Sequence, residues 1–65
     1  MSGLVQWIYV VYYCDFRVLP AQFEVLRAFK TEKRAQALVD LLTRTPFERH
    51  SLATGQYLYR KVALA

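Results

Sequence analysis

The sequence predicts an α+β fold of two layers, in which one helix packs on one face of a three-stranded, mainly antiparallel sheet. Three observations lead to this prediction: two strand-like runs come first, a run with helical periodicity follows, and a third strand-like run comes last. The chain of 65 residues has room for one small domain, residues 1–65, in the order ββαβ. A domain of this size buries only about 60% of its unfolded surface, so association with a partner is one way for it to gain stability.

The first two strands are expected over residues 4–14 and 23–30. The first run is rich in β-branched and aromatic residues, contains no Gly or Pro, and is apolar on both of its faces. The segment between the runs, residues 15–22, breaks the pattern and contains Pro20. The two strands are therefore expected to form a hairpin.

The helix is expected over residues 32–44. Thr31 is a natural N-cap, and Glu32 in the first turn complements the helix dipole. Pro46 disfavours helical geometry at the residue before it, which sets the end of the helix. Four apolar residues at positions i, i+3, i+4 and i+7 form one buried stripe: Ala35, Leu38, Val39 and Leu42.

The third strand is expected over residues 56–64, after a connection of eleven residues that ends at Gly55. In this connection, Phe47 and Leu52 are expected to pack inward as anchors. The sequence leaves two positions open for the third strand, beside the first strand or at the other edge of the sheet.

Side chains alternate along a strand, so each strand can be divided into two faces. The even-numbered residues of the first strand are smaller, and we assign them to the face under the helix. The odd-numbered residues then lie on the uncovered face. The second strand is ambiguous; we expect Val25 and Phe29 to point inward, with Arg27 near an edge.

The uncovered face would then carry an aromatic patch larger than soluble monomers usually expose, and such patches mark interaction sites. Alternatively, the tyrosines pair across strands and leave their hydroxyls in water. The predicted partner-binding residues are Trp7, Tyr9, Tyr13, Tyr57, Tyr59 and Lys61.

A second hypothesis is that the same aromatic and basic face binds nucleic acid, as stacking platforms do in single-strand binders. The net charge of +4 permits an acidic partner, although the glycine-containing motif of the common RNA-binding sheet is absent. The residues that would contact nucleic acid are Arg27, Lys33, Arg34, Arg60 and Lys61.

The sequence offers little for catalysis or metal binding. Cys14 is the single cysteine and is expected to be a buried, inert residue of the first strand, so no disulfide forms within the chain. His50 is the single histidine and is expected to be solvated in a polar loop. We therefore expect a protein that is not an enzyme and that uses no metal, cofactor or small-molecule substrate.

The segment from Phe29 to Leu42 resembles the strand, threonine cap and short helix of many orphan proteins from phages and bacteria. The resemblance implies a compact accessory protein that occludes a larger host protein, and such proteins include inhibitors of antiviral defence systems. The leading hypothesis is thus a non-enzymatic protein-binding module, acting through the aromatic sheet face on a partner protein or on a second copy as a homodimer.

The apolar run 4–14 is too short for a membrane helix, no secretory signal is visible, and the lone cysteine suits a reducing compartment, so we expect a cytoplasmic protein.

Overall fold

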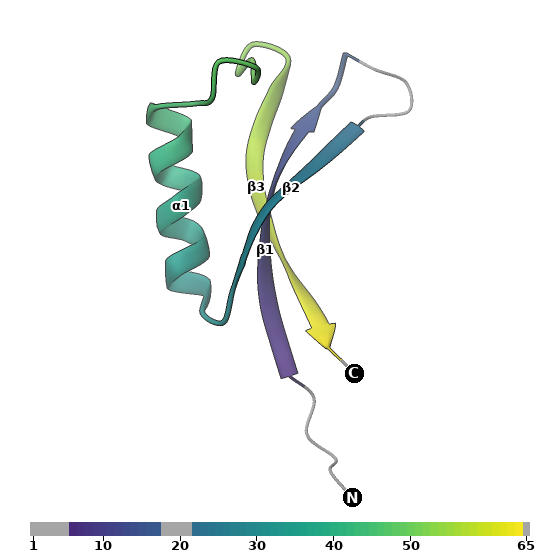
Figure 1. Cartoon of the computed structure of the whole chain (residues 1–65), viewed down its shortest axis with the longest axis vertical. Helices are drawn as coiled ribbons and strands as arrows, with labels where there is room; N and C mark the ends of the chain where they lie inside the picture. Colours follow the sequence, from purple (N-terminus) through teal and green to yellow (C-terminus); the bar gives the residue numbers. More distant parts are fainter. Residues whose placement is uncertain (1–5, 18–21, 65) are drawn as a thin grey trace, which may run out of the picture.

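A computed structural model describes residues 6–17 and 22–64 of the chain. The fold is α+β, as predicted: an open sheet of three antiparallel strands carries one helix on one side (Figure 1). Along the chain the elements are β1 (Gln6–Asp15), β2 (Gln22–Phe29), α1 (Glu32–Arg44) and β3 (Gly55–Leu64). The predicted strand residues Leu4 and Val5 lie outside the described residues.

The strand order is β2-β1-β3, which settles the position of β3 that the sequence left open. β1 lies in the centre and pairs antiparallel with both neighbours. Its pairing with β3 runs without a shift from Gln6↔Leu64 to Asp15↔Gly55. Only the odd-numbered face of this central strand lies under the helix, so burial under α1 does not account for the apolar character of its other face.

The helix begins and ends at the predicted residues. The Thr31 hydroxyl accepts a hydrogen bond from the Arg34 N–H at 3.4 Å, the arrangement of an N-cap. At the other end the Thr45 N–H donates to the Leu41 carbonyl at 2.9 Å, one residue before Pro46. Ala35 and Leu42 of the predicted stripe are buried against the sheet.

The helix covers the odd-numbered residues of β1, so the predicted face assignment is wrong. Val11 is fully buried and Tyr13 is 4% exposed in the core under the helix, together with Tyr57 of β3 at 3%. Residue size, on which the assignment depended, did not decide the face. The tyrosine hydroxyls decided it, because buried hydroxyls need hydrogen-bond partners and the loop after α1 supplies them on this side only.

A β-bulge in β2 explains why this strand was ambiguous in the sequence. The register with β1 shifts between Val11 and Tyr12, so that the alternation of β2 changes within the strand. Phe29 packs against the core as predicted, and Leu26 packs there too. Val25 was expected inside but points to the opposite side and is 70% exposed.

The connection between α1 and β3 is anchored by a different residue from those predicted. Phe47 and Leu52 remain largely exposed, so the expectation that they anchor the loop is wrong. His50, expected to be solvated, is only 6% exposed. Its backbone N–H donates to the Phe47 carbonyl at 2.9 Å, which turns the chain so that the imidazole points inward.

Candidate functional site

The side of the sheet opposite α1 is apolar, and within residues 6–17 and 22–64 no other helix or strand covers it (Figure 1). Strand alternation and the observed register place the even-numbered residues of β1 and β3 there, with the first part of β2. Phe23 and Val25 of β2 are 64% and 70% exposed. We call this surface the open-face patch; it consists of Ile8, Val10, Tyr12, Phe23, Val25, Leu58, Arg60, Val62 and Leu64.

A shallow groove of about 200 Å³ lies within the open-face patch. Its walls come from all three strands: Val10, Tyr12, Phe23, Val25, Arg60 and Val62. The rings of Tyr12 and Phe23 meet edge to face, with centroids 5.6 Å apart, and so form a fixed aromatic wall. The groove is smaller than the 300–1,000 Å³ typical of small-molecule pockets, and its size suits a protruding side chain of another protein.

The open-face patch carries one charge. Arg60 is the only charged residue among the described side chains that alternate onto this face. It lies opposite Val10 in the register and belongs to β3, an edge strand. Arg60 thus belongs to an edge strand and also lines the groove, while the other residues of the patch are uncharged.

Four of the six predicted partner-binding residues pack between the sheet and the helix instead of on the uncovered face. Tyr13 and Tyr57 belong to the buried core, and Tyr9 and Tyr59 pack against it. The Tyr59 hydroxyl donates to Glu32 Oε2 at 2.9 Å, and this hydrogen bond to a carboxylate raises the pKa of Tyr59. These tyrosines connect the sheet to the helix, so their location does not match the predicted docking surface.

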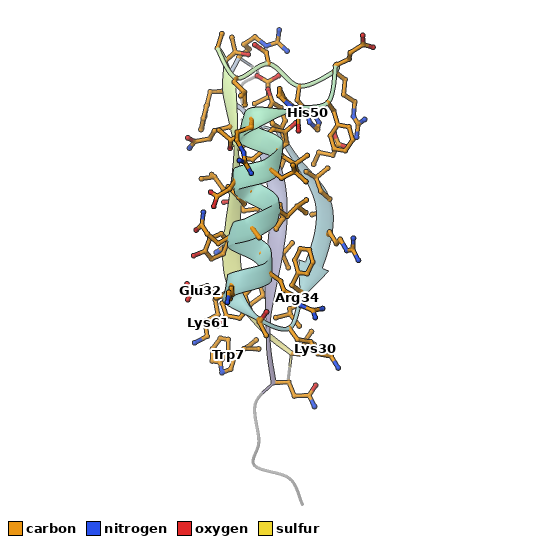
Figure 2. All side chains as sticks on the ribbon, turned by 90° about the vertical axis from the view of Figure 1, so that its left-hand side faces the viewer. Trp7, Lys30, Glu32, Arg34, His50 and Lys61 are labelled. Carbon is orange, nitrogen blue, oxygen red and sulfur yellow. The ribbon has the colours of Figure 1, made fainter. Side chains whose placement is uncertain are left out.

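The other two predicted residues, Trp7 and Lys61, lie together at the end of the molecule where the helix begins (Figure 2). The Lys61 ammonium nitrogen lies 4.6 Å from the centroid of the Trp7 ring, a cation–π contact. Trp7 remains about half exposed. Both residues are on the helix side of the sheet, because they share the parity of Tyr9 and Tyr59.

The residues predicted to contact nucleic acid do not form one continuous surface. Arg60 and Lys61 are successive strand residues and point to opposite faces of the sheet. The Arg27 guanidinium lies 5.1 Å from the ring centroid of Phe29 in β2. Lys33 and Arg34 are in the first turn of α1. The basic residues are thus divided between the two faces.

A buried cluster around His50 was missed in the sequence. The imidazole stacks on Tyr13, its Nδ1 lies 2.6 Å from the Tyr57 hydroxyl, and its Nε2 lies 2.8 Å from Glu24 Oε1. The Tyr57 hydroxyl also accepts the Phe47 N–H at 3.1 Å. A neutral imidazole with its proton on Nε2 satisfies every one of these groups, since Tyr57 then donates to Nδ1 and Nε2 donates to Glu24. The only sequence signal for this cluster was one histidine in a loop, because its partners Glu24 and Tyr57 are distant from it in the sequence.

Glu24 connects this cluster to the surface. Arg49 pairs with its carboxylate, and this hydrogen-bonded guanidinium, followed by the His50 imidazole, lowers the pKa of Glu24 to about 2. A tyrosine, a histidine and a carboxylate in line resemble a proton relay, but the Tyr57 hydroxyl is buried and bonded to the loop. The cluster therefore holds the loop on β2 and β3, while the Glu24 carboxylate remains partly exposed.

The described part of the chain contains no group of three His, Cys, Asp or Glu side chains placed to hold a metal ion. None of its helices is both long enough and apolar enough to cross a membrane. Cys14 is a free, buried thiol, as predicted.

Comparison of the chain with protein-family models, curated proteins and solved structures found no match.

Proposed function

We propose that this protein is a non-enzymatic protein-binding module whose binding surface is the open-face patch. The observation that carries the proposal is the exposure of large apolar side chains, above all Phe23 and Val25, on the side of the sheet that α1 does not cover. Contiguous apolar surface of this kind is unfavourable in water and marks interaction sites. The proposed surface replaces the tyrosine face that the sequence suggested.

The shape and charge of the patch favour a protein as the ligand. The groove accepts a side chain, and the neighbouring strands offer a broad apolar surface around it. Phe23 and Arg60, which are both exposed and line the groove, are of the types enriched at the cores of interfaces. Binding at this surface would occlude the part of the partner that it covers, without chemistry by this chain.

Site-specific photocrosslinking in the native host cells tests the proposal. A photoreactive benzoylphenylalanine at position 25 lies on the open-face patch, whereas the same group at position 41 lies on α1, where Leu41 is 49% exposed. The expected result is a protein adduct at position 25, identified by mass spectrometry and absent at position 41. Loss of this adduct when Phe23 is changed to Lys would confirm the surface. Equal adducts at both positions, or none at position 25, would contradict the proposal.

A second candidate function, binding of single-stranded nucleic acid, is favoured by the basic end of the molecule. Lys30 and Arg34 lie at the same end as the exposed Trp7 and its neighbour Lys61 (Figure 2). Basic side chains beside an aromatic ring are the usual components of single-strand binding sites. Glu32, the acidic residue at this end, is already hydrogen-bonded to Tyr59.

Fluorescence anisotropy with a labelled single-stranded oligonucleotide across a salt series tests this candidate. If it is correct, affinity falls steeply with salt, and Arg34→Ala reduces the slope of log K against log salt by about 1. Arg17→Ala, a change on the β1–β2 connection, is the matched control and leaves the slope unchanged. Absence of binding at low salt would exclude this function.

A further inference from the structure

We propose that the occupant of the open-face patch is a second copy of this chain, packed face to face across a two-fold axis. The inference rests on the proposed function, because it names the partner of the same surface. It makes the protein a homodimer of two sheets with the helices on the outside, so that each apolar face is covered by an identical one.

The area of the sheet is near the lower limit of what such a dimer requires. Three strands about 4.8 Å apart, two of ten residues and one of eight, with a rise of about 3.3 Å per residue, have a flat area of roughly 440 Å². Protruding side chains make the accessible surface larger than this flat area. Specific interfaces bury roughly 600 to 1,000 Å² per partner. The whole face is thus needed, which favours two sheets stacked along their full length, about 10 Å apart and about 30° from alignment.

The distribution of charge fits a second copy better than a charged partner. Apart from Arg60, which lines the groove, the open-face patch presents only apolar and tyrosine side chains, and an identical face offers the same surface in return. The one charged residue, Arg60, is on the edge strand β3, from which its long side chain can reach water at the border of the interface. Two copies can therefore meet without burying an unpaired charge.

Edge-to-edge pairing, the other way for two sheets to associate, is disfavoured at both edges. The bulge in β2 interrupts the regular row of backbone groups that another strand would need. On β3 the adjacent residues Arg60 and Lys61 place a positive charge on each side of the edge. An antiparallel copy of β3 would bring these like charges together. Association through the face meets neither obstacle.

The thin core of one copy supplies the driving force. The buried apolar core under α1 is small, and Val11 is its only fully buried large side chain among the described residues. No disulfide strengthens the chain, because Cys14 is the single cysteine. Covering Phe23, Val25 and their neighbours would remove further apolar surface from water, which favours association.

Sedimentation equilibrium from low to high micromolar concentration tests the inference. The full chain should have twice its monomer mass of 7.6 kDa. Val25→Lys should raise the dissociation constant of the dimer about 100-fold. The substitution is present in both copies, and each one should weaken the affinity roughly tenfold. Leu41→Lys makes the same kind of change on the exposed side of α1 and should leave the constant unchanged. Phe23→Lys is a second open-face variant, and circular dichroism checks that each variant retains its helix.

The outcomes separate this inference from the proposed function. A wild-type chain that is monomeric at high micromolar concentration would overturn the homodimer. If the crosslinker at position 25 then captures a different, identified protein, the proposed function stands with another partner; if it captures none, both are wrong. A dimer that dissociates with Leu41→Lys but not with Val25→Lys would place the interface on the helix and would also overturn the inference.

Discussion

The Tyr13 hydroxyl donates a hydrogen bond to the Ser51 carbonyl at 2.6 Å and accepts one from the Ser51 N–H at 3.0 Å. This double contact joins the central strand to the loop that follows the helix. It also determines which face of β1 is inside, because the same loop cannot serve a tyrosine that points to the other side. The open-face patch is the consequence, since Ile8, Val10 and Tyr12 of β1 then lie on the side without a helix.

Tyr13→Phe should destabilise the fold by about 1 to 3 kcal/mol, because both polar groups of the Ser51 backbone lose their buried partner. Urea denaturation followed by circular dichroism measures the free energy of unfolding. Tyr12→Phe removes the hydroxyl of the neighbouring residue on the open face and is the matched control, with an expected change within about 0.5 kcal/mol. A larger effect at Tyr12 than at Tyr13 would contradict the face assignment.

His50→Ala should lower the free energy of unfolding by roughly 2 to 4 kcal/mol. The change removes a buried ring stacked on Tyr13 and leaves the Tyr57 hydroxyl without the imidazole that accepts its hydrogen bond. Glu48→Ala alters an exposed residue of the same loop and should have an effect within about 0.5 kcal/mol. Equal effects of the two substitutions would mean that His50 does not anchor the loop.

The stability should depend on pH through Glu24. Its pKa is lowered from 4.5 to about 2 by Arg49 and His50, so its ionised form favours the folded state. The contribution is fully present above pH 4.5 and is lost as the pH falls towards 2. Because the carboxylate is partly exposed and screened by solvent, the contribution is modest and decreases with salt. The difference in urea midpoint between the wild type and Glu24→Gln should shrink over this pH range; a constant difference would contradict the ion pair.

Gly55→Ala should destabilise the fold by about 1 to 3 kcal/mol, because the strand start at Gly55 lies directly against β1. A Cβ added there would overlap the Cys14 carbonyl oxygen and would come within 2.6 Å of Tyr13 Cζ. Gln56→Ala, at the next and exposed position, is the control and should be nearly neutral. The melting temperatures of the two variants provide the comparison, and a neutral Gly55→Ala would show that β1 and β3 are less closely apposed.

The local signals in the sequence were sufficient for the elements. The Thr31 cap, the helical period and Pro46 predicted the bounds of α1, because capping and proline geometry depend on adjacent residues. The β-branched and aromatic run predicted β1 as a strand, but its central position in the sheet was left open and came only from the structure. The local signals need no knowledge of contacts between distant residues.

The orientation of the sheet faces could not be obtained in the same way. The side taken by Tyr13 depends on Ser51, which is 38 residues away in the sequence. The outward position of Val25 depends on a bulge, and a single shift of register reverses every later residue of the strand. The burial of His50 depends on Glu24 and Tyr57 from two different strands. Each error thus arose where a long-range polar contact or a backbone irregularity outweighed local pattern.

The most direct measurement of the central claim, that a second copy of the chain occupies the open-face patch, is an isotope-filtered NOE experiment. The sample mixes labelled and unlabelled copies of the chain at high micromolar concentration. The account predicts intermolecular NOEs between the methyl groups of Val25 or Val62 in one copy and the rings of Tyr12 or Phe23 in the other. Intermolecular NOEs confined to Leu41 on α1, or none from the open-face patch, would contradict it.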